Sequence, residues 1–316
     1  LPALDEGGVE RGTVELSREF VRRGATSTVI SSGGRLAAAI ERDGGRHIAL
    51  DVKTKNVLTA PLRVLRLRQV LRQERPDLVH YRSRVPGWLF TFANRALGLP
   101  FVSTVHGFNS VSAYSRIMTA GQRVICPSTA IANFIRQNYR TPEAKIRLVP
   151  RGVDPQQFDP ERLDQAFVAE FRSRFGLAGR FVVLGVGRIT PLKGYDVLIR
   201  ATALARERVP QIKTVIVGGA EAARAGTLLE LERLAEELGL KEHVVFAGSQ
   251  SKVAEVYACG DVLTSCNKAK PEAFGRSMAE ALAMGCPVIA TRFGGALDIV
   301  REGMDGWLVE PDSAEQ

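Results

Sequence analysis

The sequence predicts an α/β fold built from two doubly wound, Rossmann-like domains. With 316 residues, of which 45% are hydrophobic, the chain exceeds one ordinary domain and can bury a core in each half. Short apolar runs alternate with helical patterns through both halves, which is typical of parallel sheets. A stretch rich in turn-forming residues, 149–155, separates the two series. We therefore predict an N-terminal domain over residues 1–155 and a C-terminal domain over residues 156–316.

Each series contains five runs that we predict to be strands. Those of the first series are 28–30, 47–50, 78–80, 101–105 and 124–126, and those of the second are 181–186, 214–217, 244–246, 262–263 and 287–290. Open parallel sheets bind ligands beyond the carboxyl ends of their strands. Two such domains facing across a cleft would therefore carry their functional residues in the loops that follow the strands.

Both ends of the sequence are expected to be truncated. Residues 1–4 stand directly before a glycine turn, like a first strand without its beginning, and the chain stops at Gln316 shortly after the strand-like run 306–309.

The composition favours a cytoplasmic protein that is soluble or peripheral to a membrane. The four cysteines form neither a C-x-x-C pair nor a metal-ligand cluster, so we interpret them as reduced thiols. No run reaches the ~18 apolar residues that a membrane span needs, and the start does not resemble a signal peptide.

The net charge of +9 is distributed unevenly. Residues 1–150 contain 23 Lys and Arg against 11 Asp and Glu, a charge of +12, whereas the remainder contains 20 and 23, a charge of −3. A basic half can meet anionic lipid, an acidic acceptor or nucleic acid. Arg-rich helical patterns are equally compatible with solvated faces, so charge alone leaves these alternatives open; the cations in question are Arg63, Arg66, Arg68, Arg72 and Arg75.

Two motifs of the C-terminal half carry the chemistry. In the first, the run 182–186 leads into a glycine-bounded loop with two cations, Arg188 and Lys193, and a helix is predicted from about Tyr195. Arginine can bind two phosphate oxygens at once, and lysine adds a charge near the helix N-terminus, so the loop suits a diphosphate. Ordinary surface cations are the alternative.

The second motif places Glu272 and Glu280 at a loop-to-helix junction. A helix beginning near Phe274 would direct free N–H groups toward sugar hydroxyls or a leaving phosphate, with Glu272 beside them. Glu280, about one and two-thirds turns into the helix, could accept both hydroxyls of a ribose. Taken alone, Glu280 is better explained as an exposed helical acid, and Glu272 as an N-terminal acid favoured by the helix dipole.

Together these motifs resemble glycosyltransferase family 4, whose fold is GT-B. The likeness extends over nearly the whole chain, including Val79-His80, Thr104 to Gly107, Val149 to Asp154, and Pro287 to Thr291 with Gly294 and Gly295. It also includes Gly7-Gly8-Val9-Glu10, where a glycine turn opens a helix predicted to be amphipathic through Val9, Leu16 and Phe20.

The resemblance implies a role for each matching residue. Gly7 and Gly8 would contact the donor phosphate, Arg188 and Lys193 the diphosphate, and Glu280 the ribose. Glu272, with the backbone of Phe274 and Gly275, would bind the donor sugar, and residues 247–249 around Gly248 would approach the base. His106 matches the family histidine near the reacting carbon, although a histidine packed between sheet and loop is the alternative. His106, Arg188, Lys193 and Glu272 are thus the predicted catalytic residues.

This sequence departs from the family in two places. The familiar Glu-Pro-Phe-Gly is Glu272-Ala273-Phe274-Gly275 here. The family's final helix, which crosses back to the first domain, is expected to be absent. The first change leaves the N–H geometry plausible, whereas the second would weaken domain closure.

The implied activity is that of a retaining, metal-independent bacterial glycosyltransferase. It would move a sugar from a nucleotide-diphosphate sugar, expected to be a UDP-sugar, to a lipid-linked or surface-glycan acceptor, for example in lipopolysaccharide or exopolysaccharide synthesis. No cofactor or metal is expected beyond this donor. Arg82 and Arg84 are candidates for an anionic group of the acceptor, and the basic half for contact with anionic membrane at the inner face of the cytoplasmic membrane.

Three alternatives are weaker. A nucleotide-sugar 2-epimerase of the same architecture needs acid–base residues at the sugar C2, and no such additional set is evident. A nucleic-acid-binding module lacks a zinc knuckle, an aromatic-rich RNP strand and a recognition helix. A nucleotide-dependent dehydrogenase lacks the glycine fingerprint.

Overall fold

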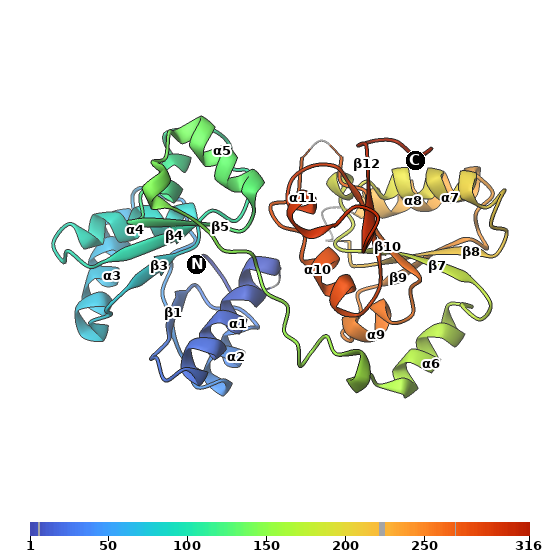
Figure 1. Ribbon diagram of the computed structural model, residues 1–316. Coiled ribbons are helices and arrows are strands. Elements are labelled where there is room, and N and C mark those ends of the chain that lie inside the picture. Colours follow the sequence, from blue (N-terminus) through green and yellow to red (C-terminus); the bar gives the residue numbers. More distant parts are fainter. Residues whose placement is uncertain (6, 221–224, 269) are drawn as a thin grey trace. The chain divides into compact units, whose positions relative to one another are not determined.

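The computed structural model describes residues 1–5, 7–220, 225–268 and 270–316 (Figure 1). The chain divides into two compact units, unit 1 (Leu1–Arg151) and unit 2 (Gly152–Gln316). The predicted α/β class is confirmed, because both units consist of parallel strands joined through helices. Within the described part of the chain, no helix is both long and apolar enough to cross a membrane.

Unit 1 contains two parallel sheets where the sequence pattern predicted one. One sheet pairs β1 (Thr28–Ser31) with β2 (Arg46–Ala49), and the other has the order β3-β4-β5-β6. These four strands are β3 (Val79–Tyr81), β4 (Phe101–Thr104), β5 (Arg123–Cys126) and β6 (Ile146–Leu148). The helices are α1 (Gly8–Arg22), α2 (Ala37–Arg42), α3 (Ala60–Glu74), α4 (Arg84–Asn94) and α5 (Thr129–Tyr139), with short 3-10 turns at Ser115–Thr119 and Glu143–Lys145.

Residues 1–4, expected to be part of a strand, are not one. They run alongside the end of β1, where the Leu4 N–H donates to Gly33 O (2.8 Å) and the Ser32 N–H donates to Pro2 O (2.9 Å). Pro2 has no N–H to return, so a regular ladder cannot form.

Helix α1 forms where the glycine turn predicted a helix, but its buried face differs from the predicted one. Thr13 and Ser17 are buried, whereas Phe20 is 45% exposed. The Ser17 hydroxyl shares a hydrogen bond with that of Ser27 (2.8 Å), so a polar contact replaces the expected apolar one.

Unit 2 has one six-stranded parallel sheet of order β12-β11-β10-β7-β8-β9. Its strands are β7 (Phe181–Val186), β8 (Ile212–Val217), β9 (Val244–Gly248), β10 (Val262–Ser265), β11 (Val288–Thr291) and β12 (Gly306–Val309). The helices are α6 (Gln165–Arg174), α7 (Tyr195–Ala205), α8 (Ala225–Glu237), α9 (Val253–Tyr257), α10 (Arg276–Ala283) and α11 (Ala296–Ile299), with 3-10 turns at Pro160–Arg162 and Pro191–Lys193.

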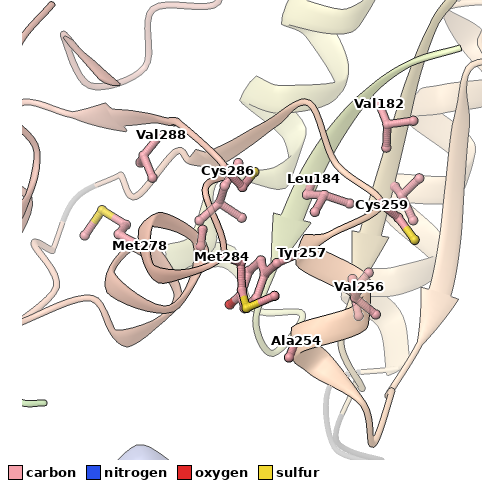
Figure 2. Packing of buried hydrophobic residues seen from close by; sticks show 14 of the residues in the cluster. Val182, Leu184, Ala254, Val256, Tyr257, Cys259, Met278, Met284, Cys286 and Val288 are labelled. Carbon is pink, nitrogen blue, oxygen red and sulfur yellow. The ribbon is translucent and has the colours of Figure 1, made fainter. Parts of the chain in front are cut away.

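Helices cover both faces of this sheet, so its central strands are buried on both sides. Val182 and Leu184 of β7 pack in one apolar cluster with α6, α9 and α10, whereas Val183 packs in the other with α7 and α8. Figure 2 shows part of the first cluster, in which Met278 of α10 lies on the side of Val288 in β11 and Tyr257 of α9 lies nearer to Leu184 of β7. Alternate side chains of a strand point to opposite faces, which accounts for the near-continuous apolar runs in the sequence.

The strand order of unit 2 reverses between β7 and β10. From β7 the chain proceeds to β8 and β9 on one side, and then to β10, β11 and β12 on the other. The loops that leave β7 and β10 therefore diverge at a topological switch point, where open α/β sheets bind ligands.

Candidate functional site

Three loops meet at the carboxyl edge of the unit 2 sheet. The loop after β7 joins the loop after β10 where the Lys268 N–H donates to Leu192 O (3.2 Å). The loop after β11 joins the same segment where the Gly295 N–H donates to Glu272 O (2.9 Å). These backbone contacts bring both predicted motifs of the C-terminal half to one place.

Lys193 and Glu272 form an ion pair between Nζ and Oε1, with each side chain about 22% exposed. The sequence predicted separate partners for them, a phosphate for the lysine and sugar hydroxyls for the glutamate. The structure places the two charges in direct contact, so a ligand anion that binds Lys193 must share it with Glu272 or displace it. Arg188 is exposed in the same loop.

A buried tyrosine shapes this loop. Tyr195, at the first position of α7, donates its hydroxyl to Gly187 O (2.9 Å), and burial raises its pKa far above the usual range. The hydroxyl therefore stays protonated and remains a donor. The sequence predicted the start of α7 at Tyr195 correctly but gave no reason to assign this contact.

Helix α10 begins at Arg276, two residues later than the sequence predicted. Gly275 stands before it with φ 102°, a left-handed conformation that ends the preceding loop and cannot continue a helix. As a result Glu280 lies little more than one turn from the helix start. The buried Phe274 and Gly275 lie directly before the free N–H groups of the first turn.

Both carboxylate oxygens of Glu280 already have partners within unit 2. Arg276 Nε lies 3.2 Å from Oε1, and the Tyr257 hydroxyl donates to Oε2 (3.1 Å). Burial, followed by the charge of Glu280, raises the pKa of Tyr257 well above its usual range, so the phenol remains a donor. The i,i+4 spacing of Arg276 and Glu280 could have predicted the first contact, but no sequence signal connects Tyr257 on α9 to Glu280.

Gly248, predicted to approach the base, is the last residue of β9. Its carbonyl accepts from the Gly218 N–H (2.9 Å), and its α-carbon faces open space. The end of β9 thus reaches the end of β8 at the same edge of the sheet.

In unit 1, His106 follows β4 and binds Arg151. Arg151 Nη2 lies 2.8 Å from His106 Nδ1, and Arg151 Nη1 donates to Gly8 O (3.3 Å). Because a guanidinium only donates, Nδ1 must accept, and a neutral His106 carries its proton on Nε2. Burial, then the charges of Arg82 and Arg151, lowers the pKa of His106 well below its usual range. The predicted site residues Gly8 and His106 are thereby joined through Arg151, which the sequence indicated only as part of the turn-rich stretch between the two domains.

Arg82 follows β3 in the same cluster and is partly buried. Burial, then the charge of Arg151, lowers its pKa to about 10. Its Nε is buried without a hydrogen-bond partner in the described part of the chain. His80 stands two residues before it, with Nε2 2.7 Å from the Thr104 hydroxyl.

Arg84, the second predicted acceptor cation, is held differently. Its guanidinium packs over the Tyr114 ring, 5.4 Å from the centroid, and donates to the Ser115 hydroxyl (3.2 Å). The Glu10 carboxylate lies close to Gly7. Arg82 therefore lies with His106 and Arg151, whereas Arg84 has partners of its own.

Comparisons with known proteins agree with the fold and the order of the motifs. The model described as Glycosyltransferase Family 4 matches residues 6–157, and the model described as Glycosyl transferases group 1 matches residues 168–316.

Three known proteins illustrate the similarity. A D-inositol 3-phosphate glycosyltransferase of Actinosynnema mirum is 30% identical over 96% of this chain and 80% of its own length. A GDP-mannose-dependent alpha-(1-6)-phosphatidylinositol monomannoside mannosyltransferase of Mycolicibacterium smegmatis is 31% identical over 81% of this chain and 69% of its own. The crystal structure of a glycosyltransferase from Rickettsia africae has a TM-score of 0.91 and 29% identity, covering 100% of this chain and 84% of that one.

Proposed function

Since the chain belongs to glycosyltransferase family 4, we propose that it is a retaining enzyme that transfers a sugar from a nucleotide-diphosphate sugar to a lipid-linked or surface-glycan acceptor. The observation that carries this proposal is the meeting of Lys193, Glu272 and the start of α10 at the switch point of unit 2. Cation, carboxylate and free N–H groups in one place suit a diphosphate joined to a sugar.

In the proposed reaction the bond between the sugar C1 and the diphosphate oxygen breaks, and a bond from an acceptor hydroxyl forms on the same face. The proton of that hydroxyl passes to the departing diphosphate. Arg188, Lys193 and the N–H groups of α10 stabilise the negative charge that develops on the leaving group, without a required metal ion. Glu272 orients sugar hydroxyls, and Glu280 accepts from the ribose.

For unit 1 we propose the roles that the family resemblance implies. The Gly8 N–H, the first of α1, has no partner within the helix and can donate to a donor phosphate. His106, whose Nδ1 accepts from Arg151, would lie near the reacting carbon.

The donor is proposed to be a UDP-sugar, with a GDP-sugar as the competing choice, because one relative is named as GDP-mannose-dependent. Both curated relatives named above carry a phosphorylated inositol group in their names, which supports an acceptor with an anionic group. Lipopolysaccharide or exopolysaccharide synthesis would supply such acceptors.

We also propose that unit 1 works at the cytoplasmic face of a membrane. An apolar stripe lies on the exposed side of α3 and the loop before it, formed by Val57, Leu58, Leu62 and Leu65, which are 77%, 86%, 53% and 57% exposed. The buried side of α3 carries Leu67 and Leu71 instead. The exposed cations Lys53, Lys55 and Arg66 accompany the stripe. Apolar side chains bordered by cations suit an anionic lipid surface.

A panel of nucleotide sugars, scored by thermal shift and by release of the nucleoside diphosphate, tests the transferase proposal. One donor should stabilise the chain saturably and be hydrolysed slowly. Arg188→Ala or Lys193→Ala should lower turnover at least about a hundredfold, because each removes charge stabilisation from the leaving diphosphate. Both variants should stay folded, and Lys193→Ala should lower the Tm because it leaves Glu272 without its ion pair.

Arg208→Ala is the matched control, because it removes one exposed cation from the same unit after α7. Its turnover should stay within about twofold of the unmodified chain. Near-normal turnover in both loop variants would refute the donor assignment, and loss of turnover on EDTA treatment would refute metal independence.

A further inference from the structure

Among the described residues, Arg82 is a cation with no counter-ion in contact. Its guanidinium has neither an ion pair nor a hydrogen bond within the described residues, and its Nε is buried. A desolvated charge without a partner is costly, and proteins normally pair it or leave it to a ligand. Glu10 and Glu15 on α1 act on it only through space.

A second unpartnered donor belongs to the same cluster. His106 Nδ1 accepts from Arg151, so the ring proton lies on Nε2, and this nitrogen is buried with no partner among the described residues. Arg82 follows β3 and His106 follows β4, which are neighbouring parallel strands, so both residues lie at the same edge of the sheet. The contact between Arg151 and His106 adds the second guanidinium to this neighbourhood. Two buried N–H donors beside a second cation are chemically complementary to an oxyanion.

The neighbouring arginine differs in this respect. Arg84 has Ser115 and the Tyr114 ring as partners, so removing a ligand would leave it satisfied. The same comparison distinguishes His80, whose Nε2 is paired with the Thr104 hydroxyl, from His106.

We propose that Arg82, assisted by Arg151 and the Nε2–H of His106, forms a binding site in unit 1 for a phosphate group, and that this group belongs to the acceptor. The inference rests on the proposed transferase function and deepens it, by assigning the acceptor anion to Arg82 and not to Arg84. The same chemistry could come from the donor diphosphate, so the experiment has an arm for each source.

Binding to the full chain is measured by calorimetry with two probes, glycerol phosphate as a simple phosphomonoester and UDP as the nucleoside diphosphate. Arg82→Met keeps the apolar stem and removes the charge. It should lower the affinity for glycerol phosphate at least about tenfold and change the affinity for UDP less than about twofold. Arg72→Met, which removes an exposed cation of α3, is the matched control and should leave both affinities unchanged.

The variant also separates a ligand site from a structural role. An unpartnered cation contributes no contact to the fold, so Arg82→Met should have a Tm equal to or above that of the unmodified chain. A marked fall in Tm would show that Arg82 has a structural partner and would overturn the proposal. Arg82→Lys, which keeps the charge, should retain part of the glycerol phosphate affinity.

Each remaining outcome decides a distinct point. Glycerol phosphate affinities that are equal in the unmodified chain and in Arg82→Met would overturn the site. If Arg82→Met lowers only the affinity for UDP, the anion belongs to the donor and the acceptor assignment is overturned. Failure of UDP and all nucleotide sugars to bind, with glycerol phosphate still dependent on Arg82, would refute the transferase proposal while leaving the anion site in place.

Discussion

At the scale of single residues, the fold of unit 1 keeps two imidazoles neutral. Burial, then the charge of Arg82, lowers the pKa of His80 to about 3, and the same kinds of cause lower the pKa of His106. A neutral His106 can hold its proton on Nε2 while Nδ1 accepts from Arg151. The arginines therefore fix the tautomer as well as the position of the ring.

This neutrality predicts a pH dependence of stability. In the unfolded chain a histidine takes up a proton near pH 6.5, whereas folded His80 does so only near pH 3. Its contribution is therefore present above pH 6.5 and is lost as the pH falls from about 6.5 toward 3, by about 1.4 kcal/mol per pH unit. His80→Gln, which can still bond Thr104, should reduce the loss of unfolding free energy between pH 7.0 and 5.5 by about 1 kcal/mol.

Urea unfolding followed through Trp88 measures this loss for unit 1, after Trp307→Phe removes the tryptophan of unit 2. The window above pH 5.5 lies clear of the carboxylates with lowered pKa, such as Asp51, which titrate at lower pH. An identical pH dependence with and without His80 would contradict a neutral buried imidazole.

At the scale of elements, the candidate site of unit 2 depends on how closely three loops approach one another. Gly295, at the start of α11, has φ −70°, a conformation that alanine adopts freely. A Cβ there would nevertheless lie 2.5 Å from Phe274 Cα, with the Phe274 carbonyl oxygen closer still. The glycine is required by space and not by conformation, because the loops after β10 and β11 touch through their backbones.

Gly295→Ala should therefore displace Glu272 and Phe274. It should lower the affinity for the nucleotide sugar that the donor panel identifies about tenfold or more, as measured by calorimetry. Gly226→Ala is the control, because that glycine lies in α8 with no atom within 4 Å of its Cβ position, and alanine favours a helix by up to about 1 kcal/mol. Its affinity should be unchanged and its Tm equal or higher. Equal affinities in both variants would show that the contact between the loops does not position the sugar-binding segment.

Most of the strands, but not all element boundaries, were predictable from the sequence. Apart from residues 1–4, every run predicted as a strand overlaps an observed strand, because buried parallel strands leave continuous apolar runs. β6 was missed because its three residues include Arg147 and Leu148, both exposed. The start of α10 was predicted two residues early, since the left-handed φ of Gly275 cannot be read from composition.

The candidate site was predictable in its composition but not in its contacts. Lys193 and Glu272 were each identified from local motifs, yet their ion pair joins loops 79 residues apart in sequence. The contact of Tyr257 with Glu280 and the burial of Arg82 depend on the tertiary structure, and no local sequence pattern predicts them. For that reason Arg82 and Arg84 were equivalent candidates in the sequence and differ in the structure.

At the scale of the whole molecule, the uneven charge and the apolar stripe act together. Residues 1–150 carry +12 and contain the stripe of Val57, Leu58, Leu62 and Leu65, whereas the remainder carries −3. Long-range attraction would bring unit 1 toward anionic lipid, and burial of the leucines would hold it there. The two contributions respond differently to salt, because screening weakens the first and not the second.

We therefore expect the chain to co-sediment with vesicles rich in phosphatidylglycerol, more weakly as NaCl rises and much more weakly with phosphatidylcholine alone. Leu62→Glu with Leu65→Glu should lower the affinity at least about tenfold, since two half-buried leucines contribute roughly 2 kcal/mol and the new carboxylates repel the surface. Leu229→Glu, at a leucine of unit 2 that is 61% exposed, is the matched control and should bind like the unmodified chain. Equal loss from the stripe variant and from Leu229→Glu would contradict a specific docking surface, as would binding that does not distinguish the two lipids.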